Sequence, residues 1–168
     1  MLRILVQAIV ENKEDNYGQE VGRLAPVVQK LFGRLTSQVT NNAEVWEIYA
    51  DLVTTNIDME TTNAFRVAQL LQKAYRSAIQ EKNWEKDLSS CTFTVKLCSK
   101  YVGSCLDMLK RESCKENIQL ASSAKLSVRS AMSTVNICYV LDVPPEIKEA
   151  LDCLKDLLKC LEDQLSLS

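Results

Sequence analysis

The sequence predicts an all-α protein made of antiparallel helix hairpins, and three observations lead to this class. The 168 residues include only 4 Gly and 3 Pro, although β-sandwiches and barrels need turn residues at roughly every 8–12 positions. Apolar residues recur at steps of three and four through most of the chain, which is the spacing of one helix face. No segment keeps the two-residue alternation of a half-buried strand.

The N-terminal part of the chain predicts four helices. They cover about residues 2–12, a stretch that ends near Val39, about 43–55 and about 61–79. Pro26 either begins the second helix, because proline is accepted in a first turn, or kinks it. Asn41 and Asn42 precede the third helix and can cap its N-terminus.

Three longer helices follow, over about residues 84–111, about 115–142 and from Pro145 to the C-terminus. The apolar stripe of the first of these consists of Leu88, Cys91, Val95, Cys98, Val102, Cys105 and Leu109. The stripe of the next has smaller residues, namely Leu120, Ala124, Val128, Ala131, Val135 and Cys138. Small side chains let neighbouring helices approach closely, so we expect these helices to pack together.

The last helix carries an apolar seam at heptad spacing, and Pro144 and Pro145 separate this helix from the preceding one. The C-terminal seam consists of Ile147, Leu151, Leu154, Leu158, Leu161 and Leu165. An uncovered seam would favour aggregation. We expect the two preceding helices to cover it; preceding repeats of a longer chain or a second copy are the alternatives.

The seven cysteines suggest a reducing compartment, because their number is odd and no disulfide framework is visible. Cys91, Cys98 and Cys105 recur every seven residues, as do Cys153 and Cys160. This spacing places each set along one helix face, which suits buried small apolar side chains. We therefore expect free thiols, mostly buried, and a cytoplasmic or nuclear location.

Charge and hydropathy argue against nucleic acid and membranes as partners. The net charge is −2 with a pI of about 5.3, and no Lys/Arg run offers the basic patch that phosphate binding needs. The first ten residues loosely resemble a signal peptide, but Gln7 interrupts them and acidic residues follow. No window reaches the roughly 18 apolar residues of a membrane span. These features predict a soluble, unprocessed chain.

The chain lacks the residues that most enzymes and metal sites need. Histidine is absent, which removes the usual general base and most zinc sites. The four glycines form no phosphate-binding loop, and no C-x-x-C motif occurs. We expect no catalytic residue, cofactor or metal; the least implausible enzyme would be a thiol-dependent one that uses Cys114.

One segment matches a helix-hairpin repeat of about 34 residues. Its first-helix pattern, W-x-x-L-G-x-x-Y, is met by Trp46, Tyr49, Ala50 and Val53. Its second-helix pattern, A-x-x-x-F-x-x-A, is met by Val67, Leu71 and Ala74. Trp84 then marks the expected start of the next repeat. The small residues leave room where the helices cross, and the large ones fill the space around them.

These residues, with Leu31–Thr40, Leu71–Tyr75 and Asn83–Asp87, resemble the C-terminal region of the tetratricopeptide repeat protein 27 family. The resemblance covers about residues 2–90 well and the remainder only in helical character. It implies a non-catalytic scaffold linked to chaperone-assisted assembly of large protein complexes, including spliceosomal ones. Members of that family are much longer than 168 residues, so the chain looks like a terminal piece or a truncated product.

Many tetratricopeptide domains grip the acidic tails of chaperones with Lys and Asn at two positions of a first repeat helix. Those positions here hold Glu47 and Asp51. Two carboxylates would repel an acidic tail. We therefore expect this repeat not to bind one.

The organisation that follows is one continuous domain in three parts. Residues 1–42 form a helical pair, residues 43–83 a degenerate tetratricopeptide repeat, and residues 84–168 a C-terminal helical cap. The favoured function is a protein–protein interaction scaffold whose partners are other proteins. A purely structural cap at the end of a longer superhelix is the alternative.

Overall fold

The computed structural model describes Val27, Lys30, Leu31, Arg34, residues 42–54 and residues 61–168. The two predicted helices before residue 42, and the capping role of Asn41, lie outside the described residues. The described helices are α3 (Ala43–Thr54), α4 (Thr61–Gln80), α5 (Leu88–Arg111), α6 (Lys115–Cys138) and α7 (Pro145–Leu167). No strand occurs among the described residues, which confirms the predicted all-α class.

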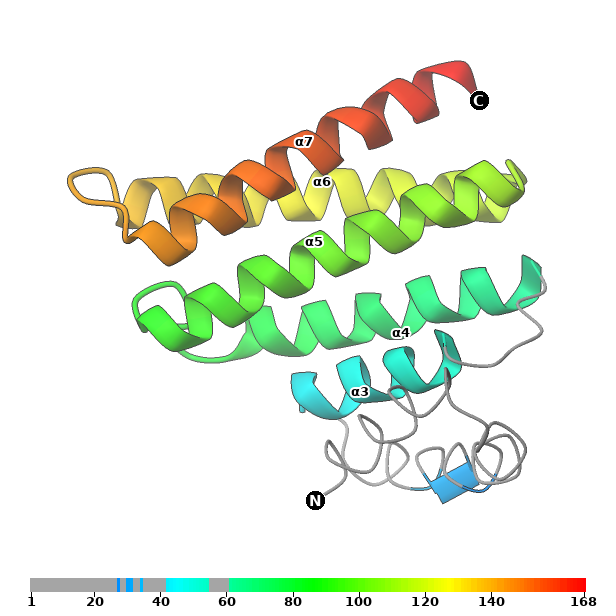
Figure 1. Ribbon diagram of the computed structural model, residues 1–168, viewed down its shortest axis with the longest axis horizontal. Coiled ribbons are helices and arrows are strands. Elements are labelled where there is room, and N and C mark those ends of the chain that lie inside the picture. The colour runs from blue at the N-terminus through cyan, green and yellow to red at the C-terminus, as the bar shows by residue number, and fades with distance from the viewer. Residues whose placement is uncertain (1–26, 28–29, 32–33, 35–41, 55–60) are drawn as a thin grey trace, which may run out of the picture.

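The helices lie side by side in a layered array that runs from α3 at one side to α7 at the other (Figure 1). Consecutive helices pack as antiparallel neighbours, and α5 contacts α4, α6 and α7. One hydrophobic cluster extends from Ala43 in α3 to Leu161 in α7. None of the described helices is both long and apolar enough to span a membrane.

Two helix starts are set by capping side chains. The Val45 backbone N–H donates to Oδ1 of Asn42 at 3.2 Å, as predicted for the start of α3. At α5, the Ser90 backbone N–H donates to the Asp87 carboxylate at 2.8 Å. The predicted start of this helix at residue 84 was therefore wrong, because residues 81–87 form a turn. Asn83 occupies the left-handed region in that turn, with φ of 62°, a conformation that asparagine tolerates better than most residues.

The end of α6 also differs from the prediction, since the helix stops at Cys138 and not at residue 142. The inward stripe of α6 would place Asp142 next on the buried face. Burying that unpaired carboxylate would cost free energy. The chain instead turns at Tyr139, and Cys138, Val140 and Leu141 are exposed.

Helix α5 is buried on more of its surface than its predicted stripe indicates. All stripe residues except Leu88 are buried, whereas Leu88, the first helical residue, is 46% exposed. A second buried row consists of Thr94, Leu97, Tyr101 and Met108. Two buried faces follow from the position of α5 between α4 and the α6–α7 pair. The ring of Tyr101 lies against that of Tyr75 in α4, with centroids 5.8 Å apart.

The C-terminal seam is covered within the chain. Its first five residues, from Ile147 to Leu161, are at most 5% exposed, and Leu165 is partly buried. Helix α7 packs mainly on α5 and to a lesser extent on α6. The two preceding helices therefore supply the cover that a heptad seam needs.

Three of the seven cysteines are buried, Cys114 is half-buried, and three are exposed, among them Cys138 of the predicted α6 stripe. Cys91, Cys98 and Cys105 are buried, as predicted, and burial raises the pKa of the Cys98 and Cys105 thiols to about 12. Cys153 and Cys160 are exposed, so the expected burial was wrong for them. Their seven-residue spacing shows that they share a helix face, but the buried face of α7 belongs to the leucine seam. All seven cysteines are free thiols.

We expect a thiol reagent to modify Cys138, Cys153 and Cys160 rapidly in the native protein, because all three are exposed. Cys91, Cys98 and Cys105 should react only after unfolding, since both burial and a low thiolate fraction protect them. Mass spectrometry of tryptic peptides after brief alkylation would measure this order. Native modification of Cys98 at the rate of Cys153 would contradict the arrangement of α5.

Candidate protein-interaction surface

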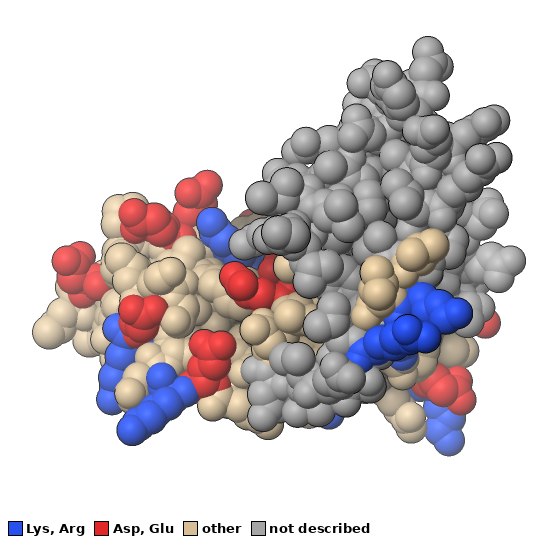
Figure 2. All heavy atoms as spheres, turned by 90° about the horizontal axis from the view of Figure 1, so that it is seen from below, with Lys and Arg blue, Asp and Glu red and all other residues tan. Residues whose placement is uncertain are grey.

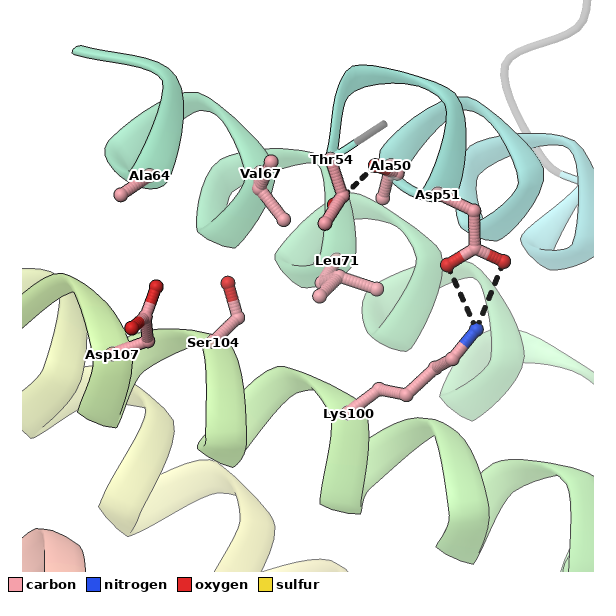
Figure 3. A pocket seen from close by; sticks show the side chains of 9 residues that line it. All are labelled: Ala50, Asp51, Thr54, Ala64, Val67, Leu71, Lys100, Ser104 and Asp107. Carbon is pink, nitrogen blue, oxygen red and sulfur yellow. Dashed lines mark hydrogen bonds and ion pairs between the residues drawn. The ribbon is translucent and has the colours of Figure 1, made fainter. Parts of the chain in front are cut away.

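A groove of about 210 Å³ lies between α3 and α5, with α4 beneath it (Figure 3). Ala64, Val67 and Leu71 of α4 form an apolar floor. Thr54 of α3 and Ser104 of α5 stand on opposite walls. An apolar floor with a few polar groups on the rim is the usual composition of a site that accepts a side chain.

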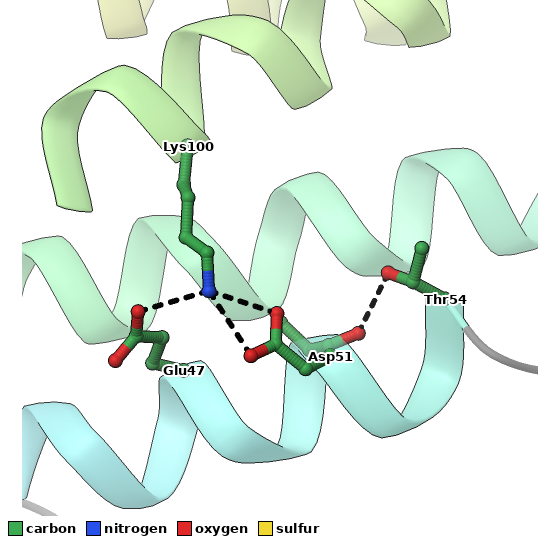
Figure 4. A network of polar contacts seen from close by, with 5 residues as sticks. Glu47, Asp51, Thr54 and Lys100 are labelled. Carbon is green, nitrogen blue, oxygen red and sulfur yellow. Dashed lines mark hydrogen bonds and ion pairs between the residues drawn. The ribbon is translucent and has the colours of Figure 1, made fainter. Parts of the chain in front are cut away.

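An ion-pair network connects the two walls of this groove. The ammonium of Lys100 in α5 donates to Oε1 of Glu47 at 2.9 Å and to the two carboxylate oxygens of Asp51 at 2.9 and 3.0 Å (Figure 4). Burial lowers the pKa of Lys100, but hydrogen bonds to both carboxylates and their charge raise it more, so the net direction is upward. Two carboxylates and one ammonium leave a net charge of −1 at this point.

Sequence reasoning identified the two acids of this network but not the lysine. Glu47 and Asp51 occupy the positions where an acid-binding repeat carries Lys and Asn. Lys100 lies 49 residues after Asp51, and no spacing rule connects residues that far apart. The one feature of the sequence that pointed to Lys100 was its position on the polar side of α5. Since Lys100 already neutralises part of the acidic pair, the groove differs from a purely acidic surface.

A second groove, of about 320 Å³, lies between α5 and α7. Its walls include Lys96 and Ser99 from α5 and Glu146, Glu149 and Cys153 from α7. Lys96, Lys100, Gly103 and Asp107 follow one another at steps of four, three and four residues, so they form one row on α5. This row, called the α5 edge below, separates the two grooves.

The centre of the α5 edge is open. A methyl group added to Gly103 would meet no atom within 4 Å apart from its chain neighbours and the backbone of its own helix. The surface therefore consists of an accessible helix edge with a groove on each flank. Acidic and basic side chains both occur on the described part of the molecular face in Figure 2.

The repeat-signature residues lie mostly in the packing beneath this surface. The buried ones are Trp46, Ala50 and Val53 of α3, Val67, Leu71 and Ala74 of α4, and Trp84. Tyr49 is partly buried. Ala50 lines the first groove beside Val67 and Leu71 (Figure 3). Trp84 lies in the turn before α5 and not on a helix, so the first helical residue of the next hairpin comes four positions later than expected.

The described residues include no group of three or more Cys, Asp or Glu side chains that could hold a metal ion. Cys114, the thiol considered for catalysis, is half-buried at the N-cap of α6, where its side chain makes no capping hydrogen bond. The buried thiols have raised pKa values, whereas a nucleophilic cysteine needs a lowered one. The buried thiols of α5 are therefore poorly suited to act as nucleophiles.

Comparison with known proteins gives one informative similarity. The chain is 30% identical over 106 residues to the tetratricopeptide repeat protein 27 homolog of Dictyostelium discoideum, a match that covers 60% of this chain. The chain spans only 12% of that relative's length. No family model and no solved structure matches. The similarity supports a tetratricopeptide-repeat-like relationship, in agreement with the helix hairpins.

The network at Lys100 provides a test of this surface. We expect Lys100→Met to lower the free energy of unfolding by up to about 1 kcal/mol, because the lysine is partly exposed and its ion pairs are screened by solvent. A double-mutant cycle with Glu47→Gln, measured by urea denaturation at low and high salt, should give a coupling energy that salt reduces. Lys96→Met is the control, and a coupling of zero at low salt would contradict the network.

Proposed function

We propose that the chain is a non-catalytic protein-interaction scaffold that binds a partner along the α5 edge. The observation that carries this proposal is the open helix edge with a groove on each flank, one of them floored by apolar residues of α4. The similarity to a tetratricopeptide repeat protein supports protein partners in general. The rigid packing of α5 would present this edge at little conformational cost.

The charges around the α5 edge indicate which partners fit. Four acidic side chains flank it, namely Glu47, Asp51, Glu146 and Glu149, and Asp107 on the edge itself is paired with Arg111. The cations on the edge are Lys96 and Lys100, and Lys100 already bridges two of the acids. A net negative surface attracts a basic or neutral segment and repels an acidic one. Binding of acidic chaperone tails at this repeat is therefore not expected.

Substitution at Gly103 tests the proposal. Gly103→Phe adds a bulky side chain to the centre of the α5 edge, where its Cβ has space, and the helix propensity of phenylalanine exceeds that of glycine. We expect proteins cross-linked to residues 1–168 in cell extract to be lost with Gly103→Phe. They should be retained with Ser123→Phe, a matched change at an exposed position of α6. Retention of every partner by a folded Gly103→Phe protein would show that the α5 edge is not the binding surface.

A structural cap is the second candidate, and the outer surface of α7 favours it. Asp152, Asp156 and Asp163 are exposed on this last helix, and a terminal repeat needs a polar outer face. In that case the helices seal the end of a longer superhelix, and neither Gly103→Phe nor Ser123→Phe changes the set of cross-linked proteins.

The narrower role rests on the family resemblance alone. It would place the chain in chaperone-assisted assembly of protein complexes, spliceosomal ones included. The cytoplasmic or nuclear location follows from the free thiols and stays a proposal. Identification of the cross-linked partners by mass spectrometry would test both.

A further inference from the structure

A third groove, of about 390 Å³, lies between α6 and α7, apart from the α5 edge. It exists because α7 packs mainly on α5 and touches α6 less extensively. The flanks of α6 and α7 that face this groove are therefore not filled by each other. Met132 of α6 and Leu158 of α7 are the apolar residues that line it.

Three of the four charged side chains that line this groove are cations. Arg129 comes from α6, and Lys155 and Lys159 come from α7. The one acid, Glu162, is already paired with Arg129. The lining thus has a net charge of +2, three cations against one anion, in a chain whose total is −2.

The basic character belongs to one flank of α7. Lys148, Lys155 and Lys159 lie on the same side of the helix, at steps of seven and four residues, together with Asp152, which pairs with Lys155 at 3.0 Å. Glu146 and Glu149 line the groove on the opposite flank, toward α5. The two flanks of α7 therefore differ in charge, and the groove toward α6 suits a ligand that the α5 edge would repel.

Two exposed apolar side chains, separated by Ser130 and Ser133, lie on the outer face of α6 near the groove. Leu126 is 67% exposed and Ile137 is 72% exposed. They are eleven residues apart, which is about three helical turns, so they share one face. No charged residue occurs between Arg129 and Asp142. Apolar, charge-depleted surface beside a polar rim is the composition of the centre of a protein interface.

We propose that the α6–α7 groove binds an acidic amphipathic segment of a partner protein. The carboxylates of the segment would meet Arg129, Lys155 and Lys159, and its apolar side chains would pack on Met132 and Leu158. A nucleic acid fits less well, because an apolar floor gives a phosphate backbone nothing to contact and the chain as a whole is acidic. This inference does not depend on the function proposed for the α5 edge.

The test uses a synthetic fluorescent peptide of about four helical turns, with Glu on one face and Leu on the other. We expect its fluorescence anisotropy to rise on titration with residues 1–168 and the affinity to fall with added salt. A peptide with Lys in place of Glu should bind at least about tenfold more weakly. Absence of binding by the acidic peptide, or equal binding of both peptides, would overturn the proposal.

Two variants locate the site. The double substitution Lys155→Glu, Lys159→Glu should lower the affinity for the acidic peptide at least about tenfold. Lys82→Glu with Lys86→Glu, at exposed positions in the turn before α5, changes the net charge equally and should have little effect. Ser133→Trp places a large side chain in the groove without a charge change and should also weaken binding of the acidic peptide. This variant tests the site if the protein with both lysines replaced does not fold. Equal weakening by both charge reversals would contradict a defined site.

Two further outcomes would assign the groove to another occupant. A dimer in sedimentation that the Lys155→Glu, Lys159→Glu variant dissociates would show that a second copy fills the groove. Displacement of the acidic peptide by a single-stranded oligonucleotide at equal concentration would indicate a nucleic-acid site. Either result would overturn the proposal, whereas loss of partners in Gly103→Phe alone concerns only the α5 edge.

Discussion

Trp46→Ala should lower the free energy of unfolding by about 3–5 kcal/mol, the usual cost of truncating a buried tryptophan. The side chain is 7% exposed and stands between α3 and α4. The Lys73 ammonium lies 4.8 Å from the centre of its ring. Truncation would leave a cavity between the two helices and remove that cation–π contact. Urea denaturation, monitored by circular dichroism, measures the change.

Two controls separate these contributions. Lys73→Met should cost no more than about 1 kcal/mol, because the cation–π contact is at the protein surface. Leu126→Ala, at an exposed position of α6, should change stability by less than about 0.5 kcal/mol. A loss below about 1 kcal/mol for Trp46→Ala would exclude the packing role that the repeat signature assigns to this residue.

Removal of residues 144–168 should have a still larger effect. The C-terminal seam is buried against α5 and α6, so deletion of α7 would expose the apolar surfaces of both helices. We expect the truncated chain to aggregate and to lose cooperative thermal unfolding, since exposed patches of this kind promote association. Leu154→Ala, a single change in the seam, should cost about 2–5 kcal/mol. Solubility, light scattering and denaturant midpoints report these effects.

The matched controls lie on the same helix. Deletion of only Ser166, Leu167 and Ser168, which are all exposed, should leave stability unchanged. Asp156→Ala on the outer face should do the same. A chain without residues 144–168 that stays monomeric and equally stable would show that the packing of α7 on α5 and α6 contributes nothing in solution.

Helix existence and the apolar stripes could be read from the sequence because both depend on local spacing. The residues that gave the stripes of α5, α6 and α7 are separated by three or four positions, and burial of such a row is the simplest way to remove it from water. The bounds of α3 and α4 were predicted to within one residue for the same reason. Five of the six predicted seam residues of α7 are buried and Leu165 is partly buried, whereas the buried Ala150 was not predicted.

The errors concern properties that local spacing does not contain. Seven-residue spacing cannot distinguish the buried face of α7 from the face that carries Cys153 and Cys160. The repeat signature predicted that α5 begins at Trp84, whereas the side chain of Asp87 caps the helix and makes it begin at Leu88. Lys100 joined Glu47 and Asp51 only through the tertiary packing of α3 beside α5. The α6–α7 groove likewise results from how far two helices stand apart.

The position of α5 determines how the described helices can open. Since α5 supplies one side of the interfaces with α4, α6 and α7, its backbone amides become accessible to solvent only when most of this packing is lost. Among the described helices, α3 packs chiefly on α4, so its separation would leave the contacts of α6 and α7 in place. Amide hydrogen exchange should accordingly be slowest in the middle of α5 and faster in α3. The grooves beside the α5 edge are therefore anchored on the most persistent element of the structure, whereas the wall formed by α3 can yield to a ligand.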